Sequence, residues 1–159
     1  MAVRFVVIGA GPAGNTAASV AATLGAQVTL VESDIIGGAA HLLDCIPSKA
    51  MIATGGALGE LSRARTMGLA AEGALDIEAL RQRITDIETR LNAQITDQLA
   101  SQGVRLLRGT GKLKGPHEVV VDTEDGVEEL GADAILVATG SRPRIPDWVT
   151  VDGERVLTT

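Results

Sequence analysis

A glycine-rich turn near the N-terminus is the feature that most constrains the fold of this chain. Residues 9–14 read Gly-Ala-Gly-Pro-Ala-Gly, the pattern G-x-G-x-x-G. The apolar run from Val3 to Ile8 before it predicts a buried strand, and the stretch of small apolar residues from Pro12 to Leu24 predicts a helix. A second apolar run, Gln27 to Val31, ends at Glu32. This β-α-β pattern within about thirty residues predicts a unit that binds a dinucleotide.

Each glycine of this turn has a distinct expected role. Gly9 permits the tight turn, Gly11 lets the backbone approach a pyrophosphate, and Gly14 lets the helix pack closely on the strand. The N-terminus of the helix then offers N–H groups and a partial positive charge to the phosphates. Glu32, eighteen residues after Gly14, can accept hydrogen bonds from a ribose and repels a 2′-phosphate. The predicted contacts are Gly9, Gly11, Pro12, Ala13, Gly14 and Glu32.

This pattern alone leaves two questions open. A tight strand-to-helix turn with an exposed glutamate would produce the same residues without any ligand. The pattern also does not distinguish NAD from FAD.

The remainder of the chain predicts an α/β fold: a Rossmann-like parallel sheet with flanking helices and a small antiparallel β-meander. We expect the strand after the long helix to lie beside the first strand of the sheet. The later elements are predicted at 38–65 (a loop, then a helix), 76–102 (a long helix with one apolar stripe), 104–107 (a strand), 111–114, 118–123 and 127–130 (the meander), and 133–138 (a buried strand).

Composition excludes several classes of function. The net charge is −6 and no basic patch is visible, which argues against a nucleic-acid partner. The single cysteine, Cys45, excludes a disulfide within the chain and is typical of a reducing compartment, so we expect a cytoplasmic protein without a metal site. The N-terminal apolar run breaks at once into glycines, unlike a signal peptide, and no stretch is long enough to span a bilayer.

Beyond the glycine-rich turn, several short motifs occur in a fixed order. They are Glu32, Gly37-Gly38, Cys45-Ile46-Pro47-Ser48-Lys49, Gly109-Thr110-Gly111 and Ala138-Thr139-Gly140. With these motifs the chain resembles the flavoprotein disulfide reductases over essentially its whole length. The resemblance implies that the chain is the first FAD-binding segment of a longer enzyme. It extends the predicted cofactor contacts to Ser33, Gly37, Gly38, Ala39, Ala40, Cys45, Lys49, Gly111, Ala138, Thr139 and Gly140. The alternative for the glycines among them is ordinary turn formation.

The family's usual pair of cysteines is incomplete in this chain. The position of the first, attacking cysteine holds Ala40, whereas the second is kept as Cys45. Disulfide exchange needs one thiolate to attack and a second to resolve the mixed disulfide. The chain is similar to a subgroup with G-G-A-A at this place that reduces quinones with NAD(P)H. The resemblance therefore implies FAD, NAD(P)H as co-substrate and a quinone-like acceptor.

Three other functions compete with this interpretation. A dihydrolipoamide dehydrogenase would share the other motifs but not Ala40. A non-catalytic FAD-binding fragment, or a site that holds NAD as a structural ligand, would share the glycine-rich turn. The acceptor and the choice between NADH and NADPH are not determined by this chain.

Three residues are the catalytic candidates that the resemblance implies. Lys49 is expected near the reactive nitrogen of the flavin, where an ammonium stabilises negative charge; its alternative is an exposed helix lysine. Cys45 either tunes the flavin or is a small buried hydrophobe beside it. His41 would donate a proton to a reduced quinone, or is plain polar surface. Asp44 is read as a solvated loop acid or as a charge near the flavin.

The domain organisation follows from the same resemblance. Residues 1–145 are predicted to be the first segment of the FAD-binding domain, and residues 146–159 the start of a linker to an NAD(P)H-binding domain that is absent from this chain. We expect these residues alone to be inactive. A homodimer is expected only for the full-length protein.

Overall fold

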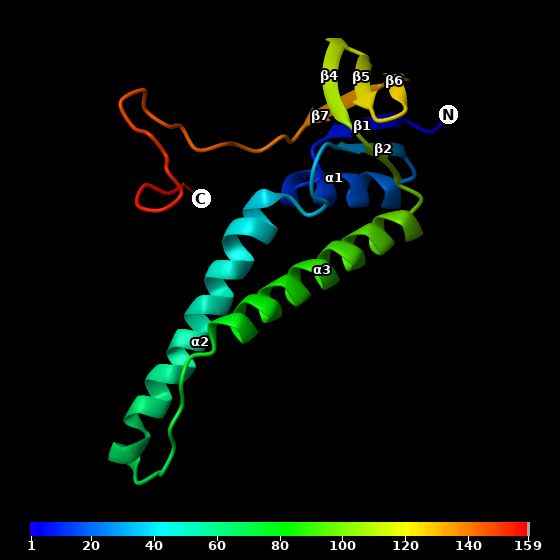
Figure 1. The fold of residues 1–159 in the computed structure, drawn as a ribbon. Helices are drawn as coiled ribbons and strands as arrows, with labels where there is room; N and C mark the ends of the chain where they lie inside the picture. The colour runs from blue at the N-terminus through cyan, green and yellow to red at the C-terminus, as the bar shows by residue number, and fades with distance from the viewer. Residues whose placement is uncertain (159) are drawn as a thin grey trace.

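The protein is a three-layered α/β fold. The computed structural model describes residues 1–158, apart from the side chains of Ala40 and His41. A four-stranded parallel sheet forms the central layer, with helices on one face and a three-stranded antiparallel sheet on the other (Figure 1). The elements are β1 (Arg4–Ile8), α1 (Pro12–Thr23), β2 (Gln27–Glu32), the π-helical η1 (Ala40–Cys45), α2 (Ile46–Arg63), the 3-10 turn η2 (Ala64–Met67), α3 (Ile77–Ser101), β3 (Arg105–Arg108), β4 (Thr110–Gly115), β5 (Glu118–Thr123), β6 (Gly126–Gly131) and β7 (Ala134–Val137).

The central sheet separates two hydrophobic cores, because successive side chains of a strand point to opposite faces. Val7 and Leu30, opposite each other in β1 and β2, are fully buried on the side of α1 and α3. Ile8 and Val31 point the other way and pack against Val121 of the antiparallel sheet. Burying each such side chain contributes about 1.5–3 kcal/mol, so both cores fix the sheet. The predicted fold class is confirmed.

Strand order corrects one expectation. β3 follows the long helix as predicted, but it pairs with β2 and not with β1, and the order is β3-β2-β1-β7. Strands that follow each other through a helical crossover usually lie side by side, which places β3 next to β2. The position on the other side of β1 is taken by β7.

β7 corrects a second expectation, because the segment 133–138 was predicted to be a buried strand. β7 is an edge strand of the described sheet with β1 as its partner, and Val137 is 53% exposed. The apolar residues of this segment therefore predicted more burial than the structure shows. After β7 the described chain runs away from the sheet to residue 158 without a helix or a strand (Figure 1).

The long helix α3 has the apolar stripe that its sequence predicts. It begins after Asp76, whose carboxylate accepts a hydrogen bond from the N–H of Ala79 at 3.0 Å. The stripe consists of Leu80, Ile84, Ile87, Leu91, Ile95 and Leu99; Leu99 is fully buried and the other five are half-buried. The reason is visible in Figure 1: the N-terminal part of α3 projects from the sheet beside α2, and only its C-terminal end reaches the core. Within residues 1–158, no helix is long and apolar enough to cross a membrane.

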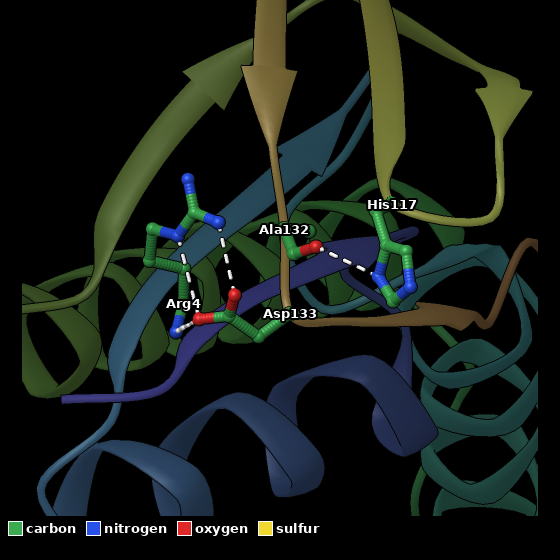
Figure 2. A network of polar contacts seen from close by, with 4 residues as sticks. All are labelled: Arg4, His117, Ala132 and Asp133. Carbon is green, nitrogen blue, oxygen red and sulfur yellow. Dashed lines mark hydrogen bonds and ion pairs between the residues drawn. The ribbon is translucent and has the colours of Figure 1, made fainter. Parts of the chain in front are cut away.

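An ion pair joins the start of β1 to the segment that leads into β7. The Arg4 guanidinium and backbone N–H both donate to the Asp133 carboxylate, and the N–H of Asp133 donates back to the carbonyl of Arg4 at 2.8 Å (Figure 2). Beside this pair, His117 and Ala132 are joined by two hydrogen bonds. The Arg4–Asp133 contacts attach the segment after β6 to β1, and the His117–Ala132 bonds join that segment to the turn between β4 and β5.

The Arg4–Asp133 pair predicts an acid-dependent part of stability. Hydrogen bonds from Arg4 hold the pKa of the Asp133 carboxyl at about 2, below its usual 3.8. A lowered pKa stabilises the folded state above pH 4, and this contribution is lost as pH falls from about 4 to about 2. We expect Asp133→Asn to lower the melting temperature at pH 6 and to match wild type near pH 2. Asp97→Asn, on the exposed face of α3, is the control. An equal difference at both pH values would contradict the prediction.

Candidate active site

A groove lies at the carboxyl ends of the parallel strands, where ligands bind in open α/β sheets. Its volume is about 480 Å³, within the range of roughly 300–1,000 Å³ that is usual for ligand sites. We call it the groove. It is lined by Ile8, Gly9, Gly11, Pro12, Ala13, Val31, Glu32, Ser33, Asp34, Ile35, Gly38, Ala39, Asp44, Gly109, Thr110, Gly111, Ala138, Thr139, Gly140, Ser141 and Arg142.

The glycine-rich loop has the close approaches that its pattern predicts. Gly9 has a φ of +104°, and a Cβ there would lie 2.3 Å from the carbonyl oxygen of Ala138. A Cβ on Gly14 would lie 1.8 Å from the carbonyl oxygen of Gly9. At Gly11 the nearest atom to such a Cβ is the Cα of Gly38, at 3.9 Å. Gly9 and Gly14 are therefore required by packing, whereas Gly11 leaves space on the groove side.

The N-terminus of α1 points its positive end at this space. Gly11 is the N-cap residue and has no side chain to cap the helix, and Pro12 occupies the first turn, which contains no acidic residue. Gly11, Pro12 and Ala13 all line the groove. A helix N-terminus with this exposure favours an anionic group such as a phosphate.

Glu32 is held at the edge of the groove by backbone donors. Its Oε2 accepts a hydrogen bond from the N–H of Ala10 at 2.6 Å, and its Oε1 accepts one from the N–H of Asp34 at 2.8 Å. Ala10 is fully buried, so this contact is a fixed part of the structure. Glu32 is half-buried and both carboxylate oxygens accept backbone hydrogen bonds, so it is not the exposed glutamate of the alternative, although the same bonds would also hold a tight turn without a ligand. Each oxygen retains acceptor capacity, which suits a ribose hydroxyl.

The loop after β2 forms the opposite wall. Gly38 has a φ of +76°, and a Cβ there would lie 2.5 Å from the Cα of Gly11. Gly37 does not line the groove, but its N–H donates to the carbonyl of Ala10 at 2.9 Å. Across the groove, Gly111 passes close to β1, since its Cβ would lie 3.0 Å from Ile8. These glycines let three backbone segments meet around one space.

Other predicted residues lie outside the groove. Cys45, before α2, and Lys49, in its first turn, are exposed and do not line it. Cys45 is exposed in the described chain, so only a bound cofactor or another segment could bury it, and its predicted place beside the flavin stays a prediction. Asp44 is half-buried and lines the groove, so it is not a fully solvated loop acid. The side chains of Ala40 and His41 lie outside the described part.

Several residues that line the groove are not among those predicted from the sequence. Asp34 and Ile35 follow β2, Gly109 and Thr110 follow β3, and Ser141 and Arg142 continue the segment after β7. Their positions in the sequence could have indicated them, because each follows the carboxyl end of a predicted strand, where ligands bind in such sheets. Arg142 is the one cationic side chain among the described residues that line the groove.

Comparison with known proteins identifies the family. The family model described as pyridine nucleotide-disulphide oxidoreductase matches residues 3–158, nearly the entire chain. The chain belongs to this family. Its members, including the relatives below, are oxidoreductases.

Two curated members of the pyridine nucleotide-disulphide oxidoreductase family are close in sequence. A Mycobacterium tuberculosis protein named NAD(P)H dehydrogenase (quinone) is 40% identical, and the alignment covers 99% of this chain and 35% of that protein. Dihydrolipoyl dehydrogenase 2 of Haloarcula marismortui is 35% identical, over 97% of this chain and 33% of that protein. The chain therefore spans about a third of the length of these relatives.

Two solved structures agree with the fold. LpdA from Mycobacterium tuberculosis superposes with a TM-score of 0.86 at 40% identity, over 98% of this chain and 35% of that one. The flavoprotein disulfide reductase RclA from Escherichia coli gives a TM-score of 0.73 over 92% of this chain and 30% of that one. At 23% identity, RclA supports the fold alone.

Proposed function

We propose that this chain is the first FAD-binding segment of an NAD(P)H oxidoreductase whose electron acceptor is a quinone-like molecule and not a disulfide. The observation that carries the proposal is Ala40 at the place of the family's attacking cysteine, with Cys45 as the single cysteine of the sequence. The groove at the carboxyl edge of the sheet supports the FAD site.

The residues of the groove fit FAD. The open space at Gly11 and the N-terminus of α1 suit a pyrophosphate, because they present backbone N–H groups and a partial positive charge. The carboxylate of Glu32 would accept hydrogen bonds from the adenosine ribose. Bound FAD would accept a hydride from a pyridine nucleotide and release electrons to an acceptor. Lys49 would supply positive charge near the flavin, as the family resemblance implies.

The proposed acceptor is supported by the number of cysteines in this segment. Disulfide reduction of the family type requires an attacking and a resolving thiolate, and residues 1–159 contain one cysteine. A small molecule that reaches the flavin directly needs neither. The name of the Mycobacterium tuberculosis relative, NAD(P)H dehydrogenase (quinone), supports a quinone-like acceptor.

Dihydrolipoamide dehydrogenase is the second candidate. It is supported by the names of several relatives that are 32–36% identical, among them that from Haloarcula marismortui. Ala40 argues against it, since that reaction passes through a dithiol. A non-catalytic FAD-binding module is the third candidate.

The acceptor is tested in the full-length protein. We expect NAD(P)H oxidation with a soluble quinone and no measurable reduction of lipoamide. Ala40→Cys restores a thiol at the position of the attacking cysteine and is expected to bring lipoamide activity only if the rest of that site is intact. Ala53→Cys, on the exposed surface of α2, is the matched control and should stay inactive with lipoamide. Wild-type lipoamide turnover at the rate of quinone turnover would contradict the proposal.

The isolated segment gives a further expectation. Residues 1–159 contain one G-x-G-x-x-G pattern, which the proposal assigns to FAD. We therefore expect these residues alone, with FAD and a quinone, to oxidise NADH poorly. Saturable turnover by the purified segment would contradict this expectation.

A further inference from the structure

The wall of the groove formed by residues 35–39 is held from outside the groove by α3. We infer that Asn92, in the middle of α3, is a positioning residue that keeps this loop in the conformation that binds a dinucleotide. The inference deepens the proposed function and rests on it. Asn92 does not line the groove and was not a candidate from the sequence.

The contact is a single hydrogen bond between segments far apart in the chain. The side-chain amide of Asn92 donates to the carbonyl of Ile36 at 2.8 Å, across 56 residues of sequence. The bond is partly buried, and Ile36 itself is 2% exposed and belongs to the core beneath the sheet. Because a carbonyl oxygen only accepts, the partner at this position must be a donor.

The neighbouring contacts of α3 show that the loop rests on this helix. A Cβ on Gly37 would lie 3.2 Å from the side chain of Ile95, one turn after Asn92. α3 thus presents one polar anchor and one apolar contact to the loop.

The residues that follow Ile36 contact the glycine-rich loop and line the groove. The next residue, Gly37, donates its N–H to the carbonyl of Ala10 at 2.9 Å. Gly38 then packs against Gly11 and lines the groove, and its carbonyl accepts from the N–H of Leu42 at 3.1 Å in η1. Fixing Ile36 therefore fixes the spacing between the two backbone walls and the start of the helical segment that follows.

Removing the anchor should loosen the loop without unfolding the protein. The carbonyl of Ile36 would lose its side-chain partner, whereas the packing of Ile95 and Leu99 would remain. Alanine also has a higher helix propensity than asparagine, which offsets part of the loss in overall stability. Since a ligand binds only the fraction of molecules with a competent loop, its apparent affinity falls by that fraction.

The test uses two Asn92 variants and two matched controls. Asn92→Ala removes the amide, and Asn92→Asp keeps its shape but cannot donate when ionised. Gln94→Ala and Gln94→Glu make the same changes at an exposed position of α3. For each protein the dissociation constant of FAD is measured by fluorescence titration, and hydrogen exchange of the Gly37 and Leu42 amides is measured without FAD.

We expect both Asn92 variants to bind FAD about tenfold more weakly, as the loss of one partly buried hydrogen bond implies. Exchange at Gly37 and Leu42 should rise by a similar factor, and the Gln94 variants should match wild type. Unchanged affinity and exchange in the Asn92 variants would overturn the inference. If wild type binds no FAD, the proposed function fails, and exchange alone then decides whether Asn92 holds the loop.

Discussion

Gly14→Ala is expected to lower the free energy of unfolding by about 3 kcal/mol or more, the upper part of the range for overpacked sites. The added Cβ would lie 1.8 Å from the carbonyl oxygen of Gly9 and 3.3 Å from the side chain of Val7. The first contact is with backbone, which cannot rotate away as a side chain can. The helix must therefore move off the strand, which separates the two sides of the glycine-rich loop.

The control for this prediction is Gly55→Ala. Gly55 lies in the interior of α2, and nothing stands within 4 Å of its expected Cβ. The same substitution there should stabilise the protein by about 0.5–1 kcal/mol, because glycine is a poor helix former. Urea denaturation followed by circular dichroism measures both. A Gly14→Ala protein as stable as wild type would show that α1 does not pack on β1 as described.

The second large effect is expected at Glu32, where Glu32→Gln should weaken FAD binding by roughly ten- to a hundredfold, the range for hydrogen bonds to a charged group. The carboxylate accepts from the N–H groups of Ala10 and Asp34 through its two oxygens. An amide has one oxygen, so one of these donors would face an NH₂ group. The substitution thus disturbs both the loop and the proposed acceptor for the ribose.

Titration with FAD measures this effect against Glu124→Gln. Glu124 is an exposed residue in the turn between β5 and β6, so Glu124→Gln removes the same charge at a position outside the groove. Its affinity for FAD should equal that of wild type. Equal affinity of the Glu32→Gln protein would remove Glu32 from the proposed site.

The elements that could be predicted from the sequence are those that local patterns determine. Gly9, Gly14 and the apolar runs on either side specify β1, α1 and β2, because tight turns and strand periodicity depend on neighbouring residues. The long helix α3 and the three strands of the antiparallel sheet follow from the same kind of signal. The groove residues of the glycine-rich loop were also predictable for this reason.

The features that were missed depend on contacts between distant segments. The pairing of β3 with β2 and the exposure of Val137 are properties of the whole sheet. The hydrogen bond from Asn92 to Ile36 joins a helix to a loop 56 residues away, and no pattern around Asn92 indicates it. The exposure of Cys45 likewise reflects what packs against it and not its own residue type.

The chemistry of the site also divides into a part that the sequence indicates and a part that only the structure shows. Two observations on the sequence, Ala40 and the single cysteine, are enough to argue against a dithiol mechanism. Asp34 and Arg142 follow the carboxyl ends of predicted strands, but only the structure shows that they line one groove together with Asp44. With Glu32, these three residues are the charged residues among those that line the groove.

The most direct test of the proposed FAD site is the visible absorption spectrum of the purified protein, followed by release and identification of any bound flavin. We expect a yellow protein that carries FAD, or an apoprotein that takes up added FAD in a one-to-one ratio. A colourless protein that fails to bind added FAD would contradict the claim that the groove around Gly11 and Glu32 forms a flavin site in this chain.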